Sequence, residues 1–221
     1  MGSMVTFPSN GETAGGYLAR AAAGGAPRGV LVIQEWWGLD GHIRSVADRF
    51  ASAGFVALAP DLYHGRVTTS PDEAGRLLMD LDIERAERDL RGAVAHLRAL
   101  TGKPVGSVGF CMGGALSLFA ACKAGTSIAA CVVYYGGYRK VEYDFDGLTA
   151  PILGHWAEDD PSVNERLPAL EAELKKRGKA YAFHHYPGTR HAFFNDERPS
   201  HHRDAAEESW RRTVAFFAAH L

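Results

Sequence analysis

The sequence predicts an α/β fold: a doubly wound, mostly parallel sheet with helices on both faces. Short apolar runs typical of buried strands alternate along the chain with amphipathic helical patterns. Right-handed crossovers between parallel strands then place helices on both faces of the sheet. No repeat, linker or low-complexity tract divides the 221 residues, so we expect a single domain over residues 4–221. Residues 1–3, which precede Met4, are expected to be a cloning remnant.

Each element is predicted from its local pattern. At the N-terminus, alternating apolar residues flank the turn signal Asn10-Gly11, which predicts a hairpin. Residues 21–29 are small and contain Gly and Pro, which predicts a loop. Buried strands are expected over residues 29–34, 55–59, 105–110, 128–135, 151–156 and 180–186. Helices are expected over residues 40–54, 83–101, 112–122, 167–174 and 210–217, with residues 65–75 as a loop entering a helix.

The composition is that of an ordinary globular protein, with 46% apolar and 23% charged residues. A net charge of −2 gives no electrostatic reason to expect nucleic acid or an anionic membrane as a partner. No apolar run approaches a membrane span and no signal peptide is evident, so we expect a cytoplasmic protein, either a monomer or a small homo-oligomer. Three cysteines at unrelated spacings do not form a disulfide framework.

The stretch Pro104–Cys122 carries the clearest chemical signal, because a predicted strand, a sharp turn and a helix follow one another there. Within it, Gly109-Phe110-Cys111-Met112-Gly113 has the spacing of a nucleophile elbow with cysteine in place of serine. The glycines let strand and helix approach closely, and the helix N-terminus favours the thiolate. The structural alternative is a small buried cysteine before a close-packed helix.

Polar residues follow several of the predicted strands. We single out Glu35, Cys111, Asp160 and His191. Since ligand sites in such sheets lie beyond the carboxyl ends of the strands, we expect these side chains to meet. A loop carboxylate such as Asp160 can hold the imidazole of His191 in its working tautomer. The order nucleophile, acid, histidine is that of the α/β-hydrolases.

Each of these residues has an alternative reading. Asp160 precedes a proline and suits a turn, and Asp159 is a rival for the acid. His191 is one of ten histidines. The paired ones are weaker candidates for the base, because His184-His185 fall inside a predicted strand and His201-His202 fall in or near a polar loop. No metal-binding motif accompanies them, so we expect no metal site. Glu35 either turns to solvent at its strand end, or faces Cys111 and exchanges a proton or hydrogen bond with the thiol.

Several segments, in order and over nearly the whole chain, resemble the dienelactone hydrolase family of α/β-hydrolases. They are Gln34-Glu35-Trp36-Trp37-Gly38, Ala59-Pro60-Asp61-Leu62-Tyr63, Gly109-Phe110-Cys111-Met112-Gly113-Gly114, Asp160-Pro161-Ser162-Val163 and His191-Ala192-Phe193-Phe194. The resemblance implies the α/β-hydrolase fold and the triad Cys111, Asp160 and His191. It also implies that Glu35 receives the thiol proton when substrate binds, and that the backbone N–H groups of Met112 and Trp36 form the oxyanion hole.

The implied activity is cysteine-dependent hydrolysis of a small-molecule lactone or activated ester through an acyl-thioester, without a cofactor. Its type substrate in the family is a carboxymethylene-butenolide. A different possibility, from the residues alone, is a redox-sensing or small-molecule-binding protein in which Cys111 is oxidised or lines a pocket. The complete set of acid and base partners favours hydrolysis.

One departure from the family concerns substrate binding. Members acting on the type substrate resemble one another in a pair of arginines that grip its carboxylate, and this chain has Asn195 at one of the two positions. Arg76, Arg66 and Arg198 are candidates to bind the substrate carboxylate instead. The alternative for each is an ordinary surface arginine exposed to solvent. The aromatic residues Trp36, Trp37, Phe193 and Phe194 suggest an apolar pocket, with core packing as their alternative.

Overall fold

The computed structural model describes residues 1–21, 27–138 and 140–221. Most of the loop predicted over residues 21–29 therefore lies outside the described residues. The strands are β1 (Ser3–Ser9), β2 (Glu12–Ala19), β3 (Arg28–Ile33), β4 (Phe55–Pro60), β5 (Val105–Phe110), β6 (Ile128–Tyr134), β7 (Ile152–Asp159) and β8 (Tyr181–Arg190). The helices are α1 (Gly41–Ser52), α2 (Pro71–Asp80), α3 (Ile83–Thr101), α4 (Met112–Ala124), α5 (Pro161–Asn164), α6 (Leu167–Lys176) and α7 (Arg203–His220), with a 3₁₀ turn at Gly125–Ser127.

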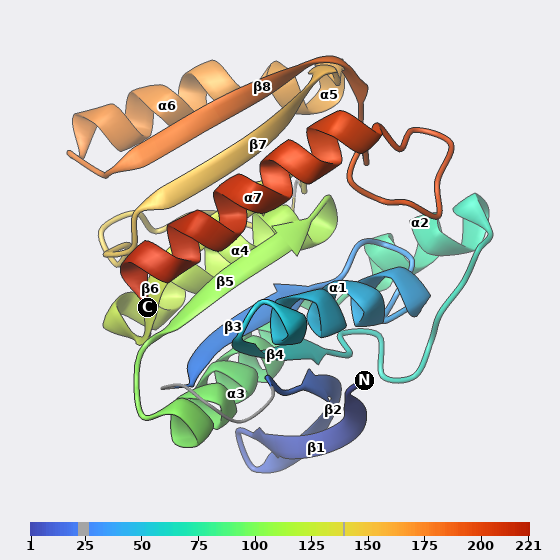
Figure 1. The fold of residues 1–221 in the computed structure, drawn as a ribbon, viewed down its shortest axis with the longest axis vertical. Helices are drawn as coiled ribbons and strands as arrows, with labels where there is room; N and C mark the ends of the chain where they lie inside the picture. Colours follow the sequence, from blue (N-terminus) through green and yellow to red (C-terminus); the bar gives the residue numbers. More distant parts are fainter. Residues whose placement is uncertain (22–26, 139) are drawn as a thin grey trace.

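In the described part of the chain, all eight strands join one sheet in the order β1-β2-β4-β3-β5-β6-β7-β8 (Figure 1). The strands from β3 to β8 are parallel to one another, and the hairpin of β1 and β2 adds antiparallel strands at one edge. The predicted doubly wound, mostly parallel sheet is therefore confirmed. Since the parallel strands end at the same edge, the loops after them meet there.

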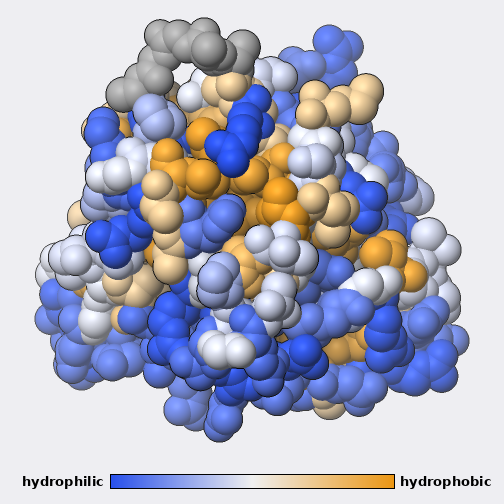
Figure 2. Space-filling view, turned by 90° about the horizontal axis from the view of Figure 1, so that it is seen from below, coloured by the Kyte–Doolittle hydropathy of each residue, from blue (hydrophilic) through white to orange (hydrophobic). Residues whose placement is uncertain are grey.

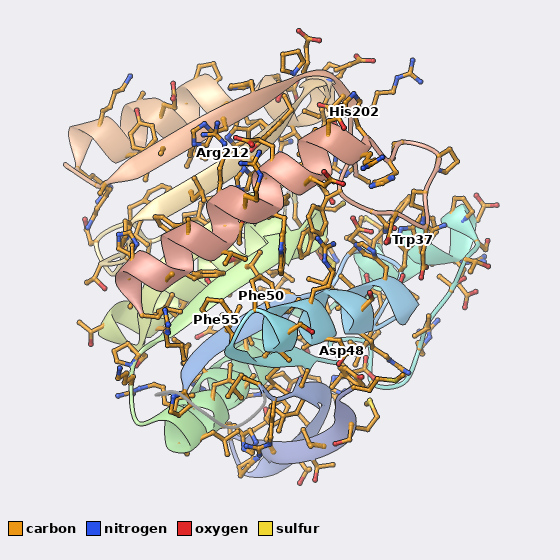
Figure 3. The ribbon with its side chains drawn as sticks, in the orientation of Figure 1. Trp37, Asp48, Phe50, Phe55, His202 and Arg212 are labelled. Atoms are coloured by element: carbon orange, nitrogen blue, oxygen red, sulfur yellow. The ribbon has the colours of Figure 1, made fainter. Side chains whose placement is uncertain are left out.

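The helices cover both faces of the sheet, as predicted. One apolar core lies between the sheet and α3, α4 and α6, and a second lies between the sheet and α1 and α7. In the second core, Phe50 of α1 and Phe55 of β4 pack edge to face with their ring centroids 5.9 Å apart (Figure 3). None of the helices among the described residues is both long enough and apolar enough to cross a membrane.

Local signals set several boundaries where the sequence predicted them. Asn10-Gly11 turns the chain between β1 and β2 with both residues at positive φ. The Asp40 side chain caps α1 by accepting a hydrogen bond from the N–H of Ile43 at 3.0 Å. Gly54, at φ 94°, follows the end of that helix. The hairpin and the first helix are thus confirmed.

Other boundaries differ from the expectation. Residues 187–190, which contain Pro and Gly and read as a loop, continue β8 instead, because β8 pairs with β7 as far as Arg190. Residues 71–75, expected to belong to a loop, already form the start of α2, because Ser70 caps that helix and Pro71 suits its first turn. The helix expected over residues 83–101 is confirmed as α3, which Asp82 caps. The first strand begins at Ser3, one residue before the expected start of the domain.

Figure 2 shows the molecule from below, at the sheet edge formed by β1. Apolar surface gathers in the middle of this view and hydrophilic residues cover most of the surface around it. Pro8 lies in β1, where its missing N–H costs no sheet hydrogen bond on the open side of an edge strand. This edge is formed by different elements from the loops that follow the parallel strands.

Candidate active site

Cys111 occupies the turn between β5 and α4, at φ 54° and ψ −118°. This is a strained conformation for a residue with a side chain, as expected for an elbow that carries a nucleophile. The Cys111 N–H donates to the Tyr134 carbonyl at 3.1 Å, and the Cys111 carbonyl accepts from Gly114 at 3.0 Å. These hydrogen bonds hold the side chain, which is partly exposed, at the N-terminus of α4.

The elbow glycines are required by close approach of the backbone. A Cβ on Gly113 would lie 2.3 Å from the Ile33 carbonyl oxygen, and one on Gly109 would lie 1.8 Å from the Gly113 carbonyl oxygen. Since these neighbours are backbone atoms, they cannot rotate away. The start of α4 therefore packs directly against the end of β3, beside Glu35.

Gly113→Ala is expected to lower the free energy of unfolding by about 3 kcal/mol or more, because the added methyl group overlaps the end of β3. Gly75→Ala is the matched control: apart from its chain neighbours and the backbone of its own helix, no described atom lies within 4 Å of its Cβ position in α2. Alanine there favours the helix by about 0.5–1 kcal/mol. Chemical denaturation of both variants measures these changes. A stable Gly113→Ala protein would contradict the close approach.

Asp160 and His191 form the ion pair that the sequence predicted. His191 Nδ1 lies 2.5 Å from Asp160 Oδ2, and Asp160 is only 4% exposed. The Ser162 hydroxyl donates to the other carboxylate oxygen at 3.1 Å. The rival acid, Asp159, is exposed and lies 3.6 Å from Arg190 instead. The structure therefore pairs Asp160, and not Asp159, with the histidine.

His191 is also close enough to Cys111 for the thiol to affect the charge of the imidazole. Burial by itself lowers the pKa of His191, but the negative charge of the Cys111 thiolate and the hydrogen bonds to Asp160 and Cys111 outweigh burial and raise it. The arrangement thus favours a charged imidazole next to the Cys111 sulfur. It brings the sulfur, the imidazole and the carboxylate together, as a cysteine nucleophile would require.

Glu35 follows β3 and is 1% exposed, so the solvent-facing alternative is wrong. Its Oε2 accepts a hydrogen bond from Asn195 Nδ2 at 2.6 Å, and its Oε1 accepts one from the Tyr135 hydroxyl at 3.3 Å. Burial raises the pKa of Glu35, and these contacts are to a neutral amide and a neutral phenol. The carboxyl group is therefore buried and is held by one residue of the β8–α7 loop and one that follows β6.

Tyr135 is a site residue that the sequence analysis missed. It follows β6, is fully buried and has φ 36°, which is unusual for an aromatic residue. Its ring lies edge-on to the His191 ring with 5.1 Å between centroids, while its hydroxyl reaches Glu35. Burial, followed by the nearby charges of Glu35 and Cys111, raises its pKa, so the phenol stays protonated and donates. Its position directly after a strand was the available signal.

The two N–H groups implied for the oxyanion hole lie on adjacent elements. Met112 is the first residue of α4, so its N–H has no acceptor within the helix. Trp36 lies in the turn after Glu35, between β3 and α1. The Met112 side chain is buried, and its sulfur accepts a hydrogen bond from the Tyr63 hydroxyl at 3.4 Å. Tyr63 thereby lies against the first residue of the elbow helix.

A cavity of about 330 Å³ adjoins Tyr63, between the loop after β4 and the junction of α2 with α3. Leucines, charged residues and a histidine line it together with Tyr63: Leu62, His64, Arg66, Leu77, Asp80, Leu81, Asp82, Arg85 and Ala86. Its volume is at the lower end of the range that small-molecule sites occupy. Of the arginines considered from the sequence, Arg66 lines this cavity.

The other predicted substrate-binding residues have different surroundings. Phe193 is fully buried and packs against the rings of Tyr135 and Tyr186, which corresponds to core packing. Asn195 is also fully buried, and its amide is used to bind Glu35. Arg76 is exposed on α2, and no contact described for it reaches Cys111, Asp160 or His191.

Trp37 has a cationic partner close to the site. The Arg198 guanidinium lies 3.7 Å from the centre of the Trp37 ring, and its Nε is buried without a hydrogen-bond partner among the described residues. Figure 3 shows Trp37 on the side of the molecule where the loop preceding α7 folds back. Stacking of this kind stabilises the arginine and tethers that loop to the turn after Glu35.

Cys122 and Cys131 differ from Cys111 in exposure. Both are buried, at 3% and 0%, as the sequence analysis expected for core residues. Burial raises the pKa of Cys122 to about 12 and that of Cys131 to about 11, so both remain protonated thiols at neutral pH. Cys111 is therefore the cysteine that a solvent-borne reagent reaches.

Comparison with known proteins finds similarity over the whole chain. A sequence model of the dienelactone hydrolase family matches residues 15–221. "Protein usf" of Aquifex pyrophilus is 37% identical, and the "Putative carboxymethylenebutenolidase" of Aquifex aeolicus is 32% identical, each over 100% of both chains. The solved structure of a "Putative Dienelactone Hydrolase" from Klebsiella pneumoniae has a TM-score of 0.88 at 26% identity and covers 99% of this chain and 98% of that one.

Proposed function

Since this chain belongs to the dienelactone hydrolase family and is a carboxylic ester hydrolase of the α/β-hydrolase fold, we propose that it hydrolyses lactones and activated esters through a thioester on Cys111. The observation that carries the proposal is the pair of Asp160 and His191, hydrogen-bonded at 2.5 Å, next to Cys111 on the elbow. A buried carboxylate orients the imidazole, and the imidazole contacts a partly exposed thiol on a strained elbow.

In the first half of the reaction, His191 takes the proton of the Cys111 thiol, and the resulting thiolate attacks the carbonyl carbon. Negative charge develops on the carbonyl oxygen, where the N–H groups of Met112 and Trp36 stabilise it, each by about 3 kcal/mol. The C–O bond then breaks and the leaving oxygen takes the proton from His191. An acyl-thioester and an alcohol result, and in a lactone both remain in one molecule.

In the second half, His191 removes a proton from water, and the resulting hydroxide attacks the thioester carbonyl. The C–S bond breaks and the carboxylic acid leaves. Because thiolate is a better leaving group than most alkoxides, the first tetrahedral intermediate returns to substrate unless the alkoxide is stabilised. We therefore propose lactones with enol leaving groups and aryl esters as substrates, and we expect slow reaction with simple alkyl esters.

Glu35 acts beside the pair of Cys111 and His191. It is hydrogen-bonded to Asn195 and Tyr135, and we propose that these contacts keep it in place, so that His191 takes the thiol proton instead of Glu35, the acceptor that the family resemblance implies. Burial raises the pKa of Glu35, and the charge of His191 opposes this effect. Since Asn195 is committed to Glu35, it is not free to bind a substrate carboxylate. We propose that uncharged lactones and esters are preferred over dienelactone.

The test is hydrolysis of p-nitrophenyl acetate before and during alkylation by iodoacetamide. We expect turnover by the untreated protein, and loss of activity in proportion to the fraction of Cys111 labelled, as measured by mass spectrometry. Cys122 and Cys131 serve as internal controls because both are buried. Absence of turnover would favour the redox-sensing or binding alternative. Turnover that survives complete labelling of Cys111 would exclude the thioester route.

A further inference from the structure

The loop between β4 and α2 is bound to both of the segments that supply N–H donors in the proposed mechanism. On one side, the Thr68 N–H donates to the carbonyl of Trp37, the residue after Trp36, at 3.0 Å. On the other side, the Tyr63 hydroxyl donates to the sulfur of Met112 at 3.4 Å. The mechanism above gives this loop no part.

The β4–α2 loop is fixed by hydrogen bonds of its own. The carboxylate of Asp61, which is buried, accepts from the N–H of Tyr63 at 3.1 Å and from that of Gly65 at 2.6 Å. The Leu62 N–H donates to Oε1 of Gln34, at the end of β3, at 3.1 Å. Tyr63 therefore leaves a backbone that is held on both sides of it.

The turn that contains Trp36 packs directly on this loop. Gly38 has φ 99°, and a Cβ at this position would lie 2.5 Å from the Arg66 carbonyl oxygen. Figure 3 shows Trp37, the residue before Gly38, beside the start of α2. Since backbone meets backbone here, the loop and the turn form one rigid unit. The N–H of Met112, on α4, belongs to a different element.

The Tyr63 hydroxyl is the link from this unit to Met112. Tyr63 is 6% exposed and Met112 is fully buried, and among the described residues the hydroxyl has no other hydrogen-bond partner than the sulfur. Burial raises the pKa of Tyr63, so the phenol stays protonated and donates. A methionine side chain has three rotatable bonds, and a hydrogen bond at its far end restricts them.

We infer that Tyr63 is a positioning residue, whose hydroxyl holds Met112 so that its N–H and that of Trp36 converge on one oxygen. The inference rests on the proposed function, because the two N–H groups stabilise the carbonyl oxygen there. Such donors act only within about 3 Å of the charged oxygen, so a small displacement of α4 against the loop weakens them. Tyr63 acts through Met112 and donates nothing to the substrate.

The Met112 N–H can be observed directly by NMR after selective labelling with ¹⁵N-methionine. The chain has four methionines, and Met1 carries the terminal amine, so three backbone amide signals are expected. Met112→Leu assigns the Met112 signal by removing it. Tyr63→Phe keeps the ring and loses only the hydroxyl. In this variant we expect the Met112 signal to shift and the Met79 signal to stay.

Tyr138→Phe is the matched control. Tyr138 is buried in the same apolar core as Tyr63, and its hydroxyl donates to the Leu78 carbonyl at 2.8 Å. That carbonyl belongs to the same peptide group as the Met79 N–H. Tyr138→Phe is therefore expected to shift the Met79 signal and to leave the Met112 signal unchanged. An unmoved Met112 signal in Tyr63→Phe, or an equal shift of it in both variants, would overturn the inference.

Steady-state hydrolysis of p-nitrophenyl acetate connects this position with catalysis. In Tyr63→Phe, kcat and kcat/KM are expected to fall together by about tenfold with KM unchanged, because the donors act on charge that develops after binding. Tyr138→Phe should retain the parent values. In a Met112→Leu background, Tyr63→Phe is expected to cause no further loss, because the acceptor is absent.

Two kinetic results would contradict the inference. They are a Tyr63→Phe protein with the parent rate, and losses from Tyr63→Phe and Met112→Leu that multiply in the double variant. The NMR comparison requires no turnover, so it separates the inference from the proposed function. A shifted Met112 signal together with a parent protein that hydrolyses no ester would support the contact and overturn the proposed function instead.

Discussion

Cys111→Ala is expected to lower kcat/KM for p-nitrophenyl acetate by about 10⁴-fold or more, because no other group can form the thioester. The N–H groups around the carbonyl oxygen and the pair of Asp160 and His191 remain in this variant. Its residual rate therefore measures ester hydrolysis by a water molecule that these groups activate, without the thiol. Steady-state hydrolysis measures the loss, and circular dichroism with thermal unfolding shows whether the variant is folded.

Cys122→Ala is the matched control for the cysteine substitution. Cys122 lies in α4, the helix that Cys111 precedes, but it is buried in the core and has a pKa raised by burial. We expect Cys122→Ala to retain the parent rate with a modest loss of stability. If Cys111→Ala kept a substantial part of the activity, attack by an activated water would replace the covalent route.

Asp160→Asn is expected to reduce kcat by about 10³- to 10⁴-fold. An amide at this position no longer stabilises the charged imidazole and favours the wrong tautomer of His191, which bonds Asp160 at 2.5 Å. The loss of charge also lowers the pKa of His191, since Asp160 contributes to raising it. Stopped-flow or steady-state hydrolysis over a range of pH measures both effects.

Asp159→Asn is the control for Asp160→Asn. The two residues are adjacent, but Asp159 is exposed and pairs with Arg190 at the surface. A surface ion pair contributes about 0–1 kcal/mol, so neither the rate nor the stability should change markedly. A large loss of activity in Asp159→Asn together with a small one in Asp160→Asn would reverse the assignment of the acid.

The sequence by itself determined the parts of this protein that depend on local pattern. Alternating apolar runs and helical periodicity predicted the mostly parallel sheet, and spacing alone placed Cys111 between glycines on a turn. These features are readable because each follows from sterics or burial within a few residues. The elbow is the clearest case, because backbone atoms of the elbow and of β3 leave no room for a Cβ at Gly109 or Gly113.

Only the tertiary structure decided which residues meet. The choice of Asp160 over Asp159 depends on the direction in which each side chain leaves the end of β7, which composition does not reveal. Glu35 could be read as exposed until Asn195 and Tyr135, both more than 90 residues away in the chain, were seen to cover it. Contacts made across the carboxyl edge of the sheet join loops of unrelated sequence, so no local pattern encodes them.

The same reason explains why the polar partner of His42 could not be predicted from the sequence. Along the chain it is the second residue of an amphipathic helix, and its apolar neighbours make it look like part of the core. Its polar partner, Asp196, lies 154 positions later on the loop that also supplies Asn195. Local physics thus sets strands, turns and the strained backbone at Cys111. The contacts that surround Glu35 exist only once the sheet brings its loops together.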